Sequence, residues 1–493
     1  MSGPCLAIFV VDVLERSRLE RLWARGEAGF LAALARRGGI RELTGRDLFA
    51  EHGTAWTLFS GVSRRVHGHH DFRQIRPGSY DIVGDEIAAC RDVQPFWWRL
   101  GGQTRLLVVD APETVPAPGL AGIQAADWLT TRAASIRRRL AVEPAAQARR
   151  FHGPASAAAG GAEYRRHATL AQDRRLIPRL LEELRRKADV CRGLAEELRP
   201  EVVVIGFQQS HTAAHRFWRH RRGGPPDLVD AIDEVYRDTD AALASIAAAL
   251  PEDADILVAS LFDMVDLYPT AGLSDSFCRI LGYHAVDAVA ARWRLRNVLP
   301  RHLREEIGWW LPSRLQESIE AAGLNATTAW SGTRAFSTST LYTTSIRVNL
   351  LGREPMGIVR PGDDYEALLD DIAADLRSLV DADTGLPAIA SIVLPSRHYD
   401  CGPHALLPDV VAEWTPRDSF RDTVLHPRAV LTQPRPQYDR DSYHAWKGFV
   451  IGAGPRLAAA GGPVDLLDVA PSCLTLLGRA VPPTLEGTPS LAR

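Results

Sequence analysis

The sequence predicts an α/β protein with a central, mostly parallel sheet flanked by helices. Short apolar runs rich in Val, Ile and Leu alternate with longer segments whose apolar residues recur about every 3.6 positions. This alternation is typical of βαβ units, in which a helix connects two parallel strands. No run approaches the roughly 18 apolar residues that a membrane-spanning helix needs.

Each element is placed by its apolar pattern. The expected buried strands are residues 6–11, 104–110, 201–207 and 255–260, with later candidates at 388–394 and 448–454. Helical spacing covers Ala28–Arg36, Arg174–Leu198 and Leu228–Leu250. We expect segments 6–11, 201–207 and 255–260 to lie in one sheet, because continuous apolar runs suit strands that are covered on both faces.

The 493 residues are enough to bury one large core, and 46% of them are hydrophobic. We expect a single domain over residues 1–493, with a helical insertion at 130–200 and a Trp-rich cap insertion at 285–345. The four tryptophans of this cap either line a substrate pocket or form the core of the cap, and the second reading is favoured. They are Trp293, Trp309, Trp310 and Trp330.

The charge balance and the cysteine content limit the classes of molecule that this protein is expected to bind and the compartment in which it is expected to act. Sixty acidic and 58 basic side chains give a net charge of -2, so the chain lacks the electrostatic signature of a nucleic-acid-binding protein. Six widely spaced cysteines with no CxxC pair indicate reduced thiols. The apolar run Leu6–Val11 is too short for a signal segment. The chain is expected to be soluble and cytoplasmic, to act on a small molecule and to bind neither nucleic acid nor membrane. Its oligomeric state is open.

Reactive side chains follow three of the expected strands, where ligands gather in open α/β sheets. Asp12 follows the first, His211 and His215 follow the strand at 201–207, and Asp263 follows the strand at 255–260. Their spacing of four puts both imidazoles on one helical face, where two nitrogens can meet one metal ion. The alternative is that the histidines are ordinary polar residues at a helix start, and that Asp12 is a helix cap.

Other histidines carry weaker signals. The tract His67, His69 and His70 follows two arginines, and a solvated loop is favoured over a metal site. His444 stands alone before the strand at 448–454, where a structural role is favoured.

Six segments in order resemble the alkaline phosphatase superfamily, specifically its type I phosphodiesterase/nucleotide pyrophosphatase branch. Three of them are Asp12 at the end of the first strand, WTLFSGVSRRVHG at 56–68 and PFWWRLGGQTRLLVVDAPET at 95–114. The others are FQQSHTAAHRFW at 207–218, IRVNLLGREPMGIVRPGDDY at 346–365 and LLDVAPSCLTLLGRAVPPTLEG at 466–487. The resemblance implies an alkaline phosphatase-like fold and a two-metal site.

One ion of that site would be held by His211, His215 and His444, the positions that match the family's ligands. The second ion would require Asp12, a nucleophile and an Asp-His pair. Leu261 and Phe262 stand in place of that pair, and Asp263 is one position late. We therefore expect one ion, with the space at Leu261 and Phe262 filled by apolar packing, or by Glu51 or Asp263 acting from a displaced position.

The nucleophile position also departs from the family. An ungapped count from Ser60 maps the nucleophile to Glu51, and Thr54 would serve only if the loop were shorter. Thr54, Glu51 and a water on the metal are the three candidates for the attacking group.

Three functions follow from these residues. The first is a metal-dependent hydrolase of a phosphate diester, phosphate monoester or sulfate ester. The second is a mononuclear three-histidine metalloenzyme whose reaction is not phosphoryl transfer. The third is a catalytically silent family member. The ion is a divalent metal such as zinc, or iron or manganese, since imidazole-rich sites do not discriminate among them.

Overall fold

A central strand, β1 (Leu6–Val13), pairs in parallel with β8 (Val202–Phe207) on one side and β9 (Asp255–Asp266) on the other. Every residue of β1 except Asp12 is buried, as a strand covered on both faces requires. The prediction that segments 6–11, 201–207 and 255–260 share a sheet is confirmed.

This computed structural model describes residues 5–50, 52–84, 93–130, 140–152, 169–287, 327–338, 340–435, 440–458 and 461–493, with isolated positions between 288 and 326. Within these ranges the main sheet holds ten strands, in the order β19-β2-β18-β9-β1-β8-β5-β6-β7, and β17 pairs with β9 outside this path. The remaining strands are β2 (Ile40–Thr44), β5 (Leu106–Val109), β6 (Gly122–Ala126), β7 (Ala141–Glu143), β17 (Ser442–Ala445), β18 (Phe449–Ala453) and β19 (Val464–Asp465).

The core of this sheet, from β9 through β1, β8 and β5 to β6, is parallel, whereas β7, β17 and β18 run antiparallel to their neighbours. The predicted α/β class with a mostly parallel central sheet is confirmed.

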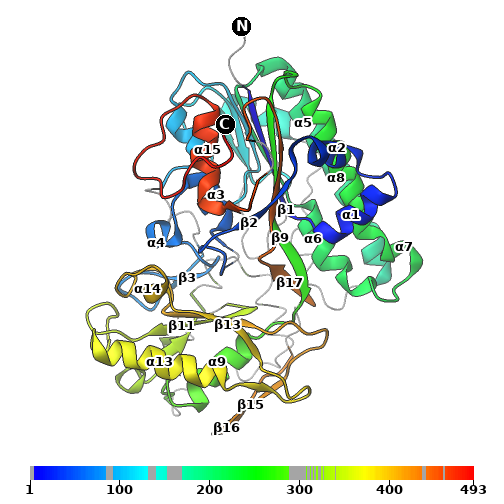
Figure 1. Cartoon of the computed structure of the whole chain (residues 1–493). Helices are drawn as coiled ribbons and strands as arrows, with labels where there is room; N and C mark the ends of the chain where they lie inside the picture. Colours follow the sequence, from blue (N-terminus) through cyan, green and yellow to red (C-terminus); the bar gives the residue numbers. More distant parts are fainter. Residues whose placement is uncertain are drawn as a thin grey trace.

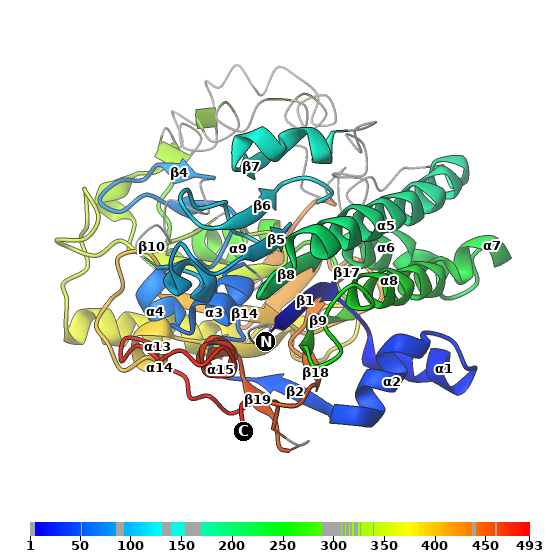
Figure 2. The ribbon, with the colours of Figure 1, turned by 90° about the horizontal axis from the view of Figure 1, so that it is seen from above.

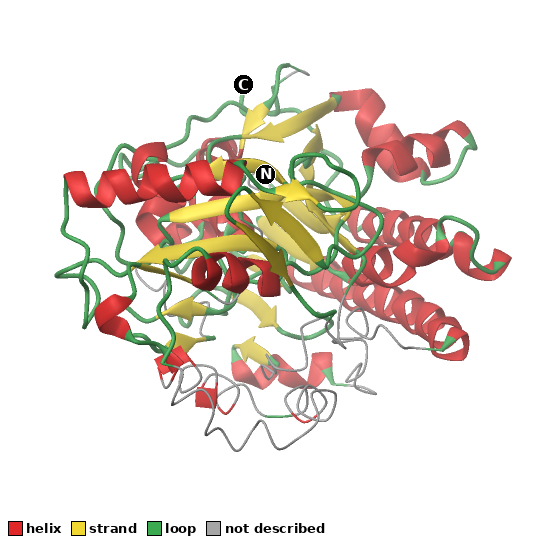
Figure 3. Ribbon diagram, turned by 90° about the horizontal axis from the view of Figure 1, so that it is seen from below, coloured by secondary structure: helices red, strands yellow, loops and turns green. Residues whose placement is uncertain are grey.

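Helices cover both faces of the main sheet (Figures 1 and 2). One face carries α1 (Arg16–Ala24), α2 (Gly29–Gly38), α5 (Leu170–Leu198), α6 (Gln209–Phe217), α7 (Pro226–Val229) and α8 (Ala231–Ala247). The other carries α3 (Thr54–Ser60), α4 (Arg64–His67) and α15 (Val469–Leu476). Seen from below, the strands lie in the middle and the helices around them (Figure 3).

Local sequence explains where the long helix α5 begins. The Thr169 side chain accepts a hydrogen bond from the backbone of Gln172, and the Gln172 side chain accepts one from the backbone of Thr169. This reciprocal capping box satisfies two backbone donors that a helix start otherwise leaves open. The helix packs along α8 and against β5, within the helical layer of the main sheet.

A second lobe lies below the main sheet and has its own apolar core (Figure 1). Its four-stranded antiparallel sheet has the order β10-β11-β14-β13 and is flanked by helices. The elements are α9 (Ala271–Ile280), β10 (Ala335–Ser337), β11 (Thr343–Val348), α13 (Asp363–Arg377), β13 (Ile389–Val393), α14 (Pro395–His398) and β14 (Val410–Trp414). Smaller sheets join β12 (Val380–Asp381), β15 (Thr423–His426) and β16 (Ala429–Thr432), and β3 (Gln74–Ile75) with β4 (Ile82–Val83).

Two sequence-based assignments need correction. The strand expected at 388–394 is not part of the main sheet but is β13 of the second lobe. The strand expected to end at residue 260 continues to Asp266, because β17 pairs with its extension. Residues 261–263 therefore lie inside β9 rather than in a loop.

Parts of the predicted insertions fall outside the described residues, among them Trp293, Trp309 and Trp310. Trp330 is buried and stacks on Tyr80, with ring centroids 3.5 Å apart. This tryptophan therefore packs inside the protein, against a residue from outside the predicted cap. No helix in the described part of the chain combines the length and apolar character that crossing a bilayer requires.

Candidate metal centre

His211 and His215 lie on α6, directly after the carboxyl end of β8. Their spacing of four residues puts both rings on one side of the helix, with ring centroids 4.6 Å apart. The side chain of His211 is 13% exposed, whereas His215 is buried.

His444 reaches the same place from the far end of the chain. It lies on β17, opposite Met264 in the extended part of β9. Its Nε2 is 3.1 Å from the Nε2 of His215, and its ring centroid is 4.9 Å from that of His211. One nitrogen from each of the three rings lies within 4.8 Å of the other two. The structure thus brings together the three histidines singled out in the sequence, and the metal ion itself stays a prediction.

Two hydrogen bonds orient these rings. His211 Nδ1 lies 2.8 Å from Asp12 Oδ2, and His215 Nδ1 lies 2.9 Å from Ser442 Oγ. The carboxylate of Asp12 can only accept, so Nδ1 of His211 carries the hydrogen and Nε2 of that ring is left for a metal ion. Asp12, expected among the metal ligands, contacts the His211 ring and is not one of the three converging donors.

Burial holds the pKa of His215 well below its usual value, and the positive charge of Arg440 adds to the effect. His215 is therefore neutral at physiological pH, as metal ligation requires. Arg440 lies over the Tyr342 ring, with its guanidinium 3.5 Å from His211 Nε2.

Apolar side chains occupy the place of the family's second metal-binding pair. Leu261 and Phe262 are buried, and Phe262 stacks on His444 with ring centroids 4.6 Å apart. The expectation of apolar packing at these two positions is confirmed. Burial raises the pKa of Asp263, and Glu15 is among the charged groups acting on it. Asp263 follows Phe262 directly on β9, and neighbouring residues on a strand point to opposite faces of the sheet.

Thr54 is fully buried at the start of α3. Its hydroxyl donates to the carbonyl of Ala50 at 3.0 Å and accepts from Arg64 Nη2 at 2.9 Å. This environment argues against an attacking role, because the oxygen is held between two internal partners. Glu51, the other residue considered for this role, lies outside the described residues.

The expectation that His67, His69 and His70 form a solvated loop is wrong, because all three side chains are buried. His67 Nε2 lies 2.9 Å from Thr57 Oγ1, and the backbone of His69 donates to His67 Nδ1. Burial lowers the pKa of His70 to about 3 and that of His67 well below its usual value. The loop is held by hydrogen bonds to the ring nitrogens of its own histidines, and such contacts leave no periodic pattern in the sequence from which burial could be predicted.

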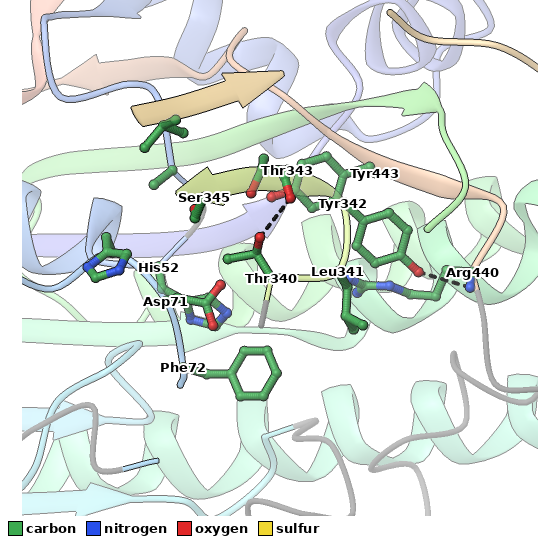
Figure 4. A pocket seen from close by; sticks show the side chains of 13 residues that line it. His52, Asp71, Phe72, Thr340, Leu341, Tyr342, Thr343, Ser345, Arg440 and Tyr443 are labelled. Atoms are coloured by element: carbon green, nitrogen blue, oxygen red, sulfur yellow. Dashed lines mark hydrogen bonds between the residues drawn. The ribbon is translucent and has the colours of Figure 1, made fainter. Parts of the chain in front are cut away.

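A pocket opens between the main sheet and the second lobe (Figure 4), and its lining residue Arg440 lies beside His211 of the histidine cluster. Arg440 and Tyr443 line one end, and His52 lines the other. The backbone of Arg440 donates to Tyr342 Oη at 3.0 Å. The other lining residues are Ala50, His70, Asp71, Phe72, Thr340, Leu341, Tyr342, Thr343, Ser345 and Val411. Arg440 was missed in the sequence because no motif or strand end marks it.

No protein-family model matches the sequence, and no curated protein matches it either. Among solved structures the chain is similar to murine ectonucleotide pyrophosphatase/phosphodiesterase 5, with a TM-score of 0.49 and 10% identity over 99% of this chain and 100% of the other. The human protein of the same name gives the same values.

Phosphonoacetate hydrolase from Sinorhizobium meliloti 1021, in complex with phosphonoformate, is similar with a TM-score of 0.48 and 13% identity, over 97% of this chain and 96% of the other. At this identity the likeness is one of fold.

Proposed function

We propose that this protein is a metal-dependent hydrolase of a phosphate ester or a related anionic ester, with one divalent ion held by His211, His215 and His444. The observation that carries the proposal is the convergence of three imidazoles beside a pocket that also presents Arg440.

The residues present fit such an ion. Two nitrogens bound to one tetrahedral ion stand about 3.4 Å apart, and the Nε2 atoms of His215 and His444 are 3.1 Å apart. Asp12 and Ser442 hold the Nδ1 atoms of His211 and His215, so that the Nε2 atoms remain for ligation. Three protein ligands leave a coordination position for water or substrate.

The ion, Arg440, Asp12 and a water molecule would each have a separate role in ester hydrolysis. A bound ion would act as a Lewis acid on the ester. Arg440 would pair with the anionic part of the substrate, since its planar guanidinium suits phosphate and sulfate oxygens. Asp12 would keep the His211 ring in place. Water is the proposed attacking group, because the Thr54 hydroxyl is already engaged by Ala50 and Arg64.

A second candidate is a mononuclear three-histidine enzyme whose reaction is not phosphoryl transfer. Phe262 favours it, because this ring covers His444 where the resemblance requires a second metal ligand. Zinc and ferrous iron are equally suited to this donor set.

Metal analysis and activity measurements test the proposal together. The purified chain, its His211→Ala variant and the control His152→Ala would be assayed for bound metal and for hydrolysis of aryl phosphate monoesters, phosphate diesters and sulfate esters. His152 is exposed and lies outside the cluster. We expect the parent and the control to bind metal and hydrolyse an ester, and His211→Ala to bind one ion fewer per chain and to lose hydrolysis. Metal binding without hydrolysis of any ester would favour the second candidate.

A further inference from the structure

A second group of metal-type ligands lies at the His52 end of the pocket. His52 Nδ1 is 3.2 Å from Glu113 Oε1, and His69 Nε2 is 3.5 Å from the same oxygen. One ligand atom from each of the three residues lies within 4.8 Å of the other two. The residues come from the segment before α3, the segment after α4 and the turn after β5, so only the fold brings them together.

The hydrogen bonds of His69 decide which ring nitrogen carries a proton. Its Nδ1 lies 2.9 Å from Gln74 Oε1, which also accepts from the backbone of His70. The Gln74 amide group donates to the carbonyl of Gly68, which sets the orientation of the amide. His69 Nδ1 therefore carries the hydrogen, and in a neutral ring Nε2 presents its lone pair to Glu113.

That arrangement requires a cation. His69 is 1% exposed, and its Nε2 is buried without a hydrogen bond. A lone pair that faces a carboxylate oxygen in a buried site is repulsive, and a positive charge between the two atoms makes the contact attractive. The charge is either a proton on Nε2 or a metal ion shared by the two residues.

The backbone is shaped to hold Glu113 in this place. The amide of Gly53 donates to both carboxylate oxygens, at 3.1 and 3.0 Å. Gly53 has a φ of +84°, and a Cβ atom there would lie 2.3 Å from the carbonyl of His69, so no side chain fits. Glu113 itself has a φ of +60°, a conformation that costs energy in a residue other than glycine. Such strain is common at functional sites.

We propose that His52, His69 and Glu113 bind a second divalent cation of the zinc class. Two imidazoles and one carboxylate are a donor set typical of zinc sites with an open position. The observed separations of 3.2 and 3.5 Å bracket the roughly 3.4 Å expected between ligands of one tetrahedral ion. The side chains of His52 and Glu113 are 25% and 16% exposed, so the open position is reachable from solvent. This site shares no ligand with the three-histidine cluster and does not depend on the proposed ester hydrolysis.

Zinc stoichiometry tests the proposal on the full chain. The protein would be stripped with a chelator, equilibrated with zinc and analysed, with cobalt as a spectroscopic substitute. The variant Glu113→Gln keeps the oxygen that accepts from Gly53 but loses the charge, and Glu182→Gln at an exposed position is the control. We expect Glu113→Gln to bind one zinc ion fewer per chain than the parent and the control. Equal zinc content in all three proteins would overturn the proposal.

Two further measurements keep the test decisive. The double variant His215→Ala/His444→Ala, which removes the first cluster, should still bind one zinc ion, and binding of none would count against the second site. In the unmodified chain, the histidine ¹⁵N resonances of His69 should report a metal-bound Nε2 once zinc is added. A protonated imidazolium that persists in excess zinc would assign the contact to an ordinary ion pair and overturn the proposal.

Discussion

Phe262 lies flat against His444, with ring centroids 4.6 Å apart and ring planes inclined by 6°. The Phe262 ring covers one face of the His444 imidazole and leaves the edge of that ring, where Nε2 lies, uncovered by the stacking. It also fills space where the resemblance to the alkaline phosphatase superfamily implies a metal-binding residue.

Replacing Phe262 by Ala should therefore weaken both folding and metal binding. Loss of a buried ring lowers the free energy of unfolding by about 3–5 kcal/mol, measured by denaturant titration. Phe277→Ala, in the separate core of the second lobe, is a matched control with a similar cost. Only Phe262→Ala should also lower zinc affinity. Equal zinc affinities in the two variants would show that the stacking does not position His444.

Asp12→Asn should lower the affinity of the three-histidine cluster about 10–100-fold, because the carboxylate that orients His211 and raises its basicity is lost. A chelator-competition titration measures this change. Asp189→Asn, at a side chain that is 70% exposed, is the control. A larger loss, to no measurable binding, would instead place Asp12 among the direct ligands.

Arg440→Lys should reduce kcat/KM for an anionic ester about 10–100-fold, because the charge remains but the paired donors are lost. Zinc affinity should not fall, since Arg440 is not a ligand. Steady-state kinetics with Arg222→Lys as control, at a side chain that is 61% exposed, checks this prediction. Unchanged kinetics in Arg440→Lys would remove this residue from substrate binding.

Thr54→Ala should cost about 1–3 kcal/mol of folding free energy, because it leaves the buried partners Arg64 and Ala50 with one hydrogen bond fewer each. Hydrolytic activity of the folded variant should remain within a few-fold of the parent if water is the attacking group. Abolished activity with intact zinc binding would return Thr54 to the role of nucleophile.

Replacing Glu183 by Gln should stabilise the protein at high pH. Burial raises the pKa of this carboxyl group from 4.5 to about 7, although Gln209 donates a hydrogen bond to it. The native state therefore holds the proton more tightly than the unfolded state, and stability is lost as pH rises from about 4.5 to 7. Glu183→Gln removes this loss, so at pH near 8 it should be up to about 3 kcal/mol more stable than the parent.

Denaturant titrations at pH near 4.5 and near 8 measure that difference. The gain should be present at the higher pH and largely absent at the lower one, where the carboxyl group is protonated in both states. A gain of equal size at both pH values would assign the effect to packing rather than to the proton.

Local sequence determined the elements of the main sheet and the pairing of His211 with His215. Continuous apolar runs marked β1, β8 and β9, because a strand covered on both faces has no polar alternation. The spacing of four residues in α6 places two imidazoles on one face of the helix, and this geometry does not depend on tertiary contacts. The apolar pattern misplaced the end of β9, which was expected at residue 260, whereas Leu261 and Phe262 continue the strand to Asp266.

Only the tertiary structure decided which third histidine lies beside His211 and His215, and that His69 is buried. His444 stands 229 residues from His215, so its approach depends on β17 pairing with the extended β9. The sequence around His69 is typical of a polar loop, and contacts with His67, Gln74 and Gly53 hold it in the interior beside Glu113. Periodicity records which face of an element is covered. The conformation of a loop is set by partners from distant segments, and a single sequence does not encode their identity in any local pattern.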